Sequence, residues 1–427
     1  MKNRIVQVNE RPPFSQLLPL SLQHLFAMFG ATVLVPFLFR VNPSTSLLLN
    51  GIGTLIYLIC ARGKIPAYLG SSFAFIAPVI AILADPSLGG YAAAQGGFIA
   101  FGLFFVIMSQ IVRLTSTRWI DVLLPPAAMG AIVAVIGLEL APVAAQMAGL
   151  IGDPMAQYQL TRPVAVSVSL ITLFTVVAGM VLFRGFFAAI PVLVAVVIGY
   201  VLSFALGIVN LDALRDAPWF QIPTLYQPTF SAHAILMLMP AFVVVLAEHV
   251  GHLVVTSQIV GRDLMRDPGL SRSLLGDGLS NIVSGFCGAT PNTTYGENIG
   301  VMAITRVYSV FVIGGTAILA IGFAFVGKLA VLIRSIPVPV MGGISLLLFG
   351  VIAAAGIRIL IEKKVDYTKP QNLIFTSVVL ISGVSGATVR IGEIELKGMA
   401  LGTMLAVLLS LLFALGARAK LLNSENA

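Results

Sequence analysis

Long apolar runs separated by short polar loops follow one another along almost the whole chain. A helix needs about 20 apolar residues to cross a bilayer, and some fourteen runs reach or approach that length. They lie near residues 14–38, 46–61, 66–84, 94–112, 120–145, 164–183, 187–208, 233–258, 273–288, 293–305, 307–333, 337–361, 371–388 and 396–416. This pattern predicts an all-α polytopic membrane protein with fourteen transmembrane segments.

The third and tenth segments differ from the others, because glycine, serine, threonine and proline interrupt them. The third contains Leu-Gly-Ser-Ser-Phe-Ala-Phe and the tenth contains Thr-Thr-Tyr-Gly-Glu-Asn. Lipid offers no partner to exposed backbone groups, so irregular backbone at this depth is tolerated only inside protein or beside a water-filled cavity. These two interruptions are therefore the predicted binding region.

The two halves of the chain resemble each other in sequence. Gln23-His24-Leu25 recurs as Glu248-His249-Val250, and LLPPAAMGAIV (123–133) recurs as IPVPVMGGIS (336–345). With seven segments in each half, the second half would lie upside down relative to the first. Such 7+7 inverted repeats are typical of secondary transporters, whose substrates bind where broken helices meet near the middle of the membrane.

Composition and charge agree with this class. The chain is 58% hydrophobic and 10% charged, and its mean hydropathy is +1.01, which excludes an ordinary soluble domain. The net charge of +8 is dispersed over short loops. Most of the lysine and arginine residues fall on one side of the predicted membrane, so that side is expected to be the cytoplasm, with both termini in it. No nucleic-acid partner is implied. Cys60 and Cys287 lie in or beside apolar runs and are interpreted as structural thiols.

Three ionisable residues are the main candidates for chemistry. Glu248 and His252 are four positions apart, so on a helix they share one face and can form a hydrogen bond. They are the predicted proton switch, whereas His249 points elsewhere and is expected to pack structurally. Glu297 follows the break in the tenth segment and is expected near a half-helix N-terminus, with the Gly296 N–H accessible.

A ligand between the two breaks would meet two carboxylates, backbone N–H groups and the rings of Phe73 and Tyr295. This is the complement of a planar, neutral pyrimidine or purine base, and an inorganic anion would be repelled. Gln23 and His24 either line the cavity or bridge neighbouring helices. Asp277, Asn298, Thr305 and Arg306 are expected to cap backbone locally, with a coupling role as the alternative, and Glu139 is expected to be solvated.

The stretch Glu297-Asn-Ile-Gly-Val-Met-Ala-Ile-Thr-Arg306 resembles the signature of the nucleobase-ascorbate transporter family. The resemblance extends over nearly the full length, including SLQHLFAMFGATVLVP (21–36) and KIPAYLGSSFAFIAP (64–78). It implies a core domain of about 14–113 and 233–333 (segments 1–4 and 8–11). It also implies a gate domain of about 120–208 and 337–416 (segments 5–7 and 12–14), with short antiparallel strands in segments 3 and 10.

Carried over residue by residue, the resemblance implies a site for uracil. Glu248 and Glu297 would bind the base by their side chains, Phe73 and Gly296 by backbone amides, and Ala31 and Tyr295 by packing. His252 would be bonded to Glu248. Phe349 stands where the family pattern leads us to expect a tyrosine. Supporting or cavity positions are Gln23, His24, Ser72, Asn298, Thr305 and Arg306.

The resemblance further implies proton-coupled uracil import across the bacterial cytoplasmic membrane, with a homodimer as one assembly it allows. No cofactor, metal or catalytic residue is expected. A purine carrier on the same fold is the nearest alternative, although that branch usually has glutamine at the position of Glu297. A sulfate or bicarbonate exchanger on the same architecture should have a cationic site, whereas both central charges here, Glu248 and Glu297, are acidic. An intramembrane enzyme is a further alternative, but the sequence offers it no nucleophile–base pair beyond Glu248 and His252.

Overall fold

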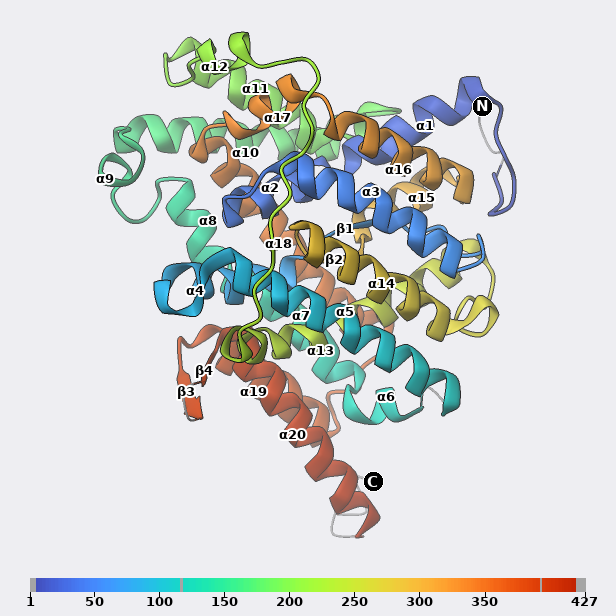
Figure 1. The fold of residues 1–427 in the computed structure, drawn as a ribbon. Coiled ribbons are helices and arrows are strands. Elements are labelled where there is room, and N and C mark those ends of the chain that lie inside the picture. The colour runs from blue at the N-terminus through green and yellow to red at the C-terminus, as the bar shows by residue number, and fades with distance from the viewer. Residues whose placement is uncertain (1–4, 116–117, 392–393, 420–427) are drawn as a thin grey trace.

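The computed structural model describes residues 5–115, 118–391 and 394–419, and within them the chain is mostly helical (Figure 1). The helices are α1 (Phe14–Ala27), α2 (Phe29–Phe39), α3 (Pro43–Cys60), α4 (Ile76–Ala84), α5 (Gly90–Leu114), α6 (Arg118–Leu123), α7 (Pro126–Glu139), α8 (Ala141–Met147), α9 (Pro154–Tyr158), α10 (Arg162–Leu182), α11 (Pro191–Ala205), α12 (Asp212–Asp216), α13 (Ala232–Val260), α14 (Leu270–Cys287), α15 (Gly296–Thr305), α16 (Val310–Ala324), α17 (Gly327–Arg334), α18 (Val338–Glu362), α19 (Pro370–Val384) and α20 (Gly398–Arg418). The strands are β1 (Leu69–Ser71), β2 (Asn292–Thr294), β3 (Thr388–Ile391) and β4 (Ile394–Lys397).

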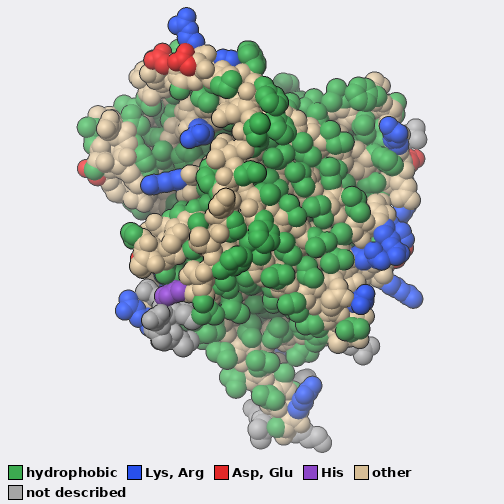
Figure 2. Space-filling view, viewed as in Figure 1, with side chains coloured by type: hydrophobic (Ala, Val, Ile, Leu, Met, Phe, Trp, Pro, Cys, Tyr) green, Lys and Arg blue, Asp and Glu red, His purple; other side chains and the backbone are tan. Residues whose placement is uncertain are grey.

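Several of these helices match the apolar runs closely. Among the described residues, 8 helical spans are long and apolar enough to cross a membrane, and four further apolar helices have 10–17 residues. The space-filling view shows a broad hydrophobic surface over the middle of the molecule (Figure 2). Such a surface is expected where lipid, and not water, surrounds the protein.

The expected strands in the third and tenth segments are present. β1 and β2 pair antiparallel, with Leu69 opposite Thr294 and Ser71 opposite Asn292, and all six strand residues are buried. The pair lies among α3, α13 and α14 in the middle of the molecule (Figure 1). Pairing satisfies backbone groups of the two buried strands that lipid could not, which favours bringing the two distant breaks in the chain together.

Close helix crossings depend on pairs of glycines. α5 and α14 meet at Gly102 and Gly278, where a Cβ on Gly278 would lie 2.8 Å from the carbonyl oxygen of Gly102. α7 and α18 meet in the same way at Gly130 and Gly356, where a Cβ on Gly356 would lie 2.5 Å from the Gly130 carbonyl oxygen. Small residues at such crossings let the backbones of membrane helices approach each other.

These crossings belong to two sets of neighbouring helices. In one set, α14 packs against α3 and α5, and α16 packs against α1 and α3. In the other set, α18 packs against α7 and α10, and α19 packs against α7 and α20. α13 contacts members of both sets, including α5, α7 and α20.

Several parts of the chain differ from the pattern expected from sequence: the segment expected at 14–38 is divided into α1 and α2, and the one expected at 307–333 into α16 and α17. The single segment expected at 120–145 is divided into α6, α7 and α8, because Pro125-Pro126 and Pro142 interrupt the helical backbone. The segment expected at 396–416 begins instead with a strand, since β4 pairs with β3 before α20 starts.

The start of the described chain forms a strap that pairs with the segment following α15. The N–H of Val6 donates to the carbonyl of Arg306 (3.0 Å), and the N–H of Tyr308 donates to the carbonyl of Val6 (2.8 Å). The N–H of Val310 donates to Val8 (3.0 Å). The Val8 side chain is fully buried and packs with residues from α13 and α15.

Candidate functional site

Two short helical segments leave the strand pair and carry the candidate binding groups. β1 leads into a 3-10 turn at Phe73–Phe75 and then α4, while β2 leads through Tyr295 into α15. Because the strands are antiparallel, the two segments leave from opposite ends of a ladder of three residue pairs, about 7–10 Å long. Because this ladder is so short, the two segments start near each other inside the protein.

Tyr295 locks this junction. Its N–H donates to the carbonyl of Tyr68 (3.0 Å) and its hydroxyl donates to the carbonyl of Ser71 (2.9 Å). Its ring covers Gly70, where an added Cβ would lie 2.3 Å from a ring carbon. On the other side of the ladder, the N–H of Ser72 donates to the carbonyl of Pro291 (2.8 Å). The backbone at the break is thus fixed by partners from the opposite half of the chain.

The two glutamates come from helices that meet at this junction. Glu297 is in the first turn of α15, as expected, and Glu248 is in α13, which packs against both α15 and β2. The helices that carry them are in contact, and both residues are only partly buried. A ligand in this place would face two hydrogen-bond acceptors.

His252 does not bond to Glu248, so that expectation is wrong for the described structure. Its Nδ1 is hydrogen-bonded to Thr294 Oγ1 at 3.0 Å, and its Nε2 would lie 3.3 Å from a Cβ on Gly296. Because α13 packs against β2, the imidazole of His252 is hydrogen-bonded to Thr294 in β2 and not to Glu248 on its own helix. The Gly296 position and the ring of His252 are consequently neighbours.

Aromatic rings close the region around Phe73. The rings of Phe73 and Phe349 are 6.4 Å apart between centroids and nearly perpendicular, at 86°. Phe349 comes from α18 and is 1% exposed, whereas Phe73 is partly exposed. Ala31 lies in α2, and its side chain is outside the described part of the structure. Ser72 is buried beside the turn.

The supporting residues differ in how they are used. Asn298 Nδ2 and His24 Nδ1 are 3.2 Å apart, so this pair connects α15 to α1 and the expected local cap at Asn298 is wrong. Gln23 is buried beside His24. Local roles are confirmed for Thr305, which donates to the carbonyl of Val301 (2.8 Å), and for Arg306, which ends α15 in the left-handed conformation.

A buried polar network behind the site was not expected from sequence. Asp277 is in the middle of α14 and fully buried, so it caps no helix end; its Oδ2 is 2.8 Å from His249 Nδ1. His249 Nε2 is 2.7 Å from Ser273 Oγ, which is 2.7 Å from the Tyr57 hydroxyl. The structural role expected for His249 is confirmed. The sequence signal is Asp277 within a helix that also contains the polar residues Ser273 and Asn281.

The network continues to the strand that precedes Glu297. Asn281 Nδ2 donates to Asp277 Oδ1 (2.9 Å) and to the carbonyl of Asn292 (3.0 Å), and Asn281 Oδ1 accepts the N–H of Asn292 (2.6 Å). Side chains of α13 and α14 thereby hold β2 from behind. Buried polar groups that are satisfied in this way fix one backbone position.

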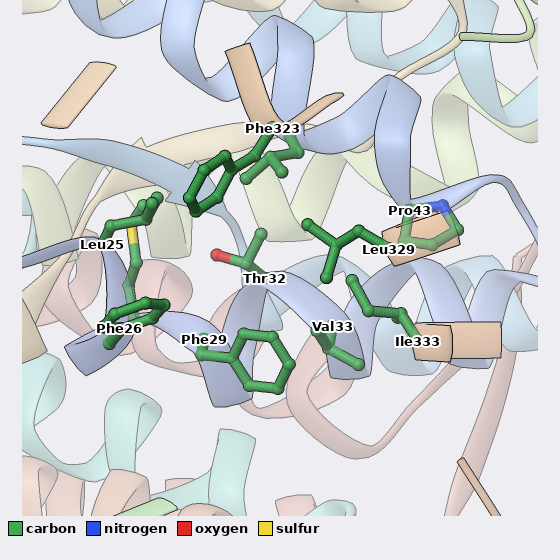
Figure 3. A pocket seen from close by; sticks show the side chains of 11 residues that line it. Leu25, Phe26, Phe29, Thr32, Val33, Pro43, Phe323, Leu329 and Ile333 are labelled. Atoms are coloured by element: carbon green, nitrogen blue, oxygen red, sulfur yellow. The ribbon is translucent and has the colours of Figure 1, made fainter. Parts of the chain in front are cut away.

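Glu139 and a small cavity lie outside this arrangement. Glu139 is partly buried and accepts the N–H of Met399 (2.9 Å) at the start of α20, so the expected solvated role is wrong. A cavity of about 70 Å³ lies beside the break between α1 and α2, and Figure 3 shows the side chains that line it. Thr32 is the one described lining residue with a polar side chain, so this cavity does not offer the acceptors that a nucleobase needs.

A helical membrane protein in which two broken spans meet through paired strands has the architecture of a secondary transporter. Solved structures agree on the fold. The murine Slc26a9 anion transporter has a TM-score of 0.71 at 12% identity, covering 95% of this chain and 69% of that one. The transmembrane domain of the cyanobacterial bicarbonate transporter BicA has a TM-score of 0.60 at 18% identity, covering 95% and 99%.

Sequence comparison gives the family. The model of the xanthine/uracil permeases, described as the Permease family, matches residues 15–392, and the chain belongs to this family. Similar relatives include the uracil permease of Escherichia coli K12, 63% identical over 415 residues (97% of this chain, 95% of that protein). The uracil permease of Paenibacillus larvae is 57% identical over 413 residues, with 97% of each covered. The chain is a multi-pass membrane protein.

Proposed function

We propose that this protein is a permease that imports uracil together with a proton. The observation that carries the proposal is the placement of Glu248 and Glu297 beside the paired broken spans, in a chain 63% identical to a uracil permease over nearly its full length. Uracil has two N–H groups and two carbonyl oxygens on a flat ring. Two carboxylates and nearby backbone N–H groups offer the matching acceptors and donors.

In this proposal each candidate residue has a definite role. The carboxylates of Glu248 and Glu297 accept hydrogen bonds from the ring N–H groups, and the backbone N–H groups of Phe73 and Gly296 donate to its carbonyls. Ala31, Tyr295 and Phe349 pack around the base. The half-buried state of Phe73, Glu248 and Glu297 supports a place that a small polar molecule can reach.

Proton coupling follows from the same carboxylates. Two ionised carboxylates close together repel each other, so a proton on one of them favours the arrangement in which both face a neutral base. His252, next to Gly296, is a third group that can hold a proton in this region. Loading from outside and release inside require that protonation change the relative stability of the two facing states.

The proposal includes the finer architecture. Fourteen segments in a 7+7 inverted repeat would form a core domain (about 14–113 and 233–333) and a gate domain (about 120–208 and 337–416), which move against each other. The two sets of neighbouring helices support this division. The site would lie in a bacterial cytoplasmic membrane with both termini inside, and a homodimer is compatible with it.

Uptake of labelled uracil into proteoliposomes tests this function. We expect accumulation only with an inward proton gradient, and loss of accumulation in Glu297→Gln at equal protein incorporation. Uptake that is indifferent to the gradient would remove the symport proposal. Competition by xanthine as strong as that by unlabelled uracil would instead indicate a purine carrier, and competition by sulfate would indicate an anion exchanger.

A further inference from the structure

A second cavity, widely open to the surface and of about 480 Å³, lies between the end of α5 and the link that joins α13 to α14. Its lining includes Arg113 of α5, Asp263 and Arg266 of the link, and Ser271 at the start of α14. None of its lining residues belongs to the proposed uracil site. The volume falls in the range of about 300–1,000 Å³ that small-molecule sites usually have.

The charges around this cavity favour an anion. Within the described residues, the side chains of Arg113 and Arg266 have no ion pair and no hydrogen bond, and both residues are exposed. Two acidic groups lie nearby: Asp263 also lines the cavity and accepts the N–H of Arg266 (3.2 Å), and Asp267 is paired with Lys64 at 2.6 Å. The lining therefore has two guanidinium groups against one unpaired carboxylate, which leaves it net positive.

An apolar track leads away from the same cavity. Beyond Ser271, the apolar residues Leu275, Leu279, Ile282 and Phe286 recur along one face of α14 at helical spacing, and Ile282 also packs against Gly102 of α5. Leu279 is 36% exposed and Phe286 is 53% exposed, while the other three are partly exposed. In a membrane-spanning helix, a partly exposed apolar face is one that meets lipid tails.

We propose that this cavity binds the headgroup of an anionic phospholipid. The phosphate lies between Arg113 and Arg266, where planar guanidinium groups can each donate two hydrogen bonds to its oxygens. One acyl chain follows the apolar face of α14. A basic cavity continuous with a lipid-facing track matches a molecule that has its charge at one end and its hydrocarbon at the other.

The location gives the lipid a consequence for transport. The link that lines the cavity joins α13, which carries Glu248 and His252, to α14, which carries Asp277. A bound phosphate would hold the end of α5 against this link. Anionic lipid is therefore expected to stabilise the packing of the helices that support the uracil site.

Lipid binding to the purified, delipidated protein tests the inference. The probes are phosphatidylglycerol and phosphatidylcholine, and the readout is the number and affinity of bound lipids by native mass spectrometry. We expect phosphatidylglycerol to bind in preference, and the double variant Arg113→Gln/Arg266→Gln to bind it at least about tenfold more weakly. Arg184→Gln/Arg418→Gln, which removes two exposed arginines elsewhere, should bind it like the unchanged protein.

Three results would overturn the inference. They are unchanged phosphatidylglycerol binding in the Arg113/Arg266 variant, an equal loss in the Arg184/Arg418 variant, and displacement of the lipid by millimolar inorganic phosphate, which would point to a soluble phosphate compound. Retention of uracil binding by the Arg113/Arg266 variant shows that it is folded, and its thermal midpoint serves the same purpose if uracil does not bind at all. Because lipid binding is measured directly, its outcome is independent of uracil transport.

Discussion

Single side chains decide what the space beside the strand pair can hold. Glu248 and Glu297 come from different helices, and each is partly exposed although it lies among apolar spans. Ionisable residues at such depth are costly and are kept where they act on a substrate or ion. Substitutions at these two glutamates are expected to change uracil binding, whereas substitutions at the buried polar residues behind them are expected to change stability.

Replacing Glu297 with glutamine is expected to weaken uracil binding by about 10–100-fold. The amide offers a poorer acceptor than a carboxylate, and a hydrogen bond to a charged group contributes about 1.5–3 kcal/mol. Calorimetric titration of purified protein with uracil measures the change. Glu362→Gln, at an exposed carboxylate paired with Arg358, is the control and should leave the affinity as it was. Equal affinities for all three proteins would contradict the proposed contact.

Phe349→Tyr tests the one departure from the family pattern. Phe349 meets Phe73 edge to face and is 1% exposed. If the new hydroxyl reaches the base, a net gain of about 0.5–1.5 kcal/mol should tighten uracil binding by about 2–10-fold. Titration of uracil and of 5-substituted uracils against both proteins checks this. A lower thermal midpoint with no gain in affinity would show that the hydroxyl is buried without a partner.

Asp277→Ala is expected to destabilise the protein by about 3–5 kcal/mol, because it leaves His249 buried without its partner. Thermal unfolding of the purified protein gives the comparison. Asp267→Ala removes an exposed ion pair with Lys64 and should cost about 0–1 kcal/mol. Similar midpoints for the two variants would mean that the buried pair contributes little.

The sequence reveals some of these residues and hides the roles of others. Glu248 and Glu297 stand out because charge is rare in apolar spans, and Gly296 because it is the small residue at the break, directly before Glu297. The roles of Asp277 and Asn298 differ from the local capping expected, since their partners His249 and His24 come from other helices. Spacing along one helix shows neighbours three or four positions away and cannot show a contact between distant segments.

The paired broken spans are the element on which the site depends. Gly70 has room for the Tyr295 ring only because it has no Cβ. Gly70→Ala should displace that ring, with a cost of about 1–3 kcal/mol in stability and weaker uracil binding. Thermal unfolding and titration report both effects. Gly322→Ala, where an added Cβ meets no atom within 4 Å, is the matched control. Equal behaviour of the two variants would argue against a rigid junction.

Element boundaries follow from sequence where the apolar pattern is continuous. The span expected at 233–258 is α13 (Ala232–Val260), and the one expected at 273–288 is α14 (Leu270–Cys287). The sequence pattern does not predict the β3–β4 hairpin, because its residues adjoin an apolar run and short strands outside a large sheet leave a weak alternating pattern.

For the molecule as a whole, the strap fastens the beginning of the chain to its second half. Val8 is fully buried against α13 and α15, the helices that carry Glu248 and Glu297. Val8→Asp would place a carboxylate there without a partner, and we expect a loss of at least about 2 kcal/mol together with slower uptake. Ile5→Asp is the control, since Ile5 is 43% exposed. If the two variants have the same unfolding midpoints and the same uptake rates, the strap is dispensable.

The junction between β1 and β2 also bears on how the protein is made. The Tyr295 hydroxyl and its acceptor Ser71 are 224 positions apart, so a ribosome releases the first interrupted span long before its mate exists. Until then, its unpaired backbone groups must be sheltered by the translocon, by water or by neighbouring helices. A nascent chain halted before residue 292 would be inserted in the bilayer and yet unable to hold a base. Only synthesis of the second interrupted span would complete the site.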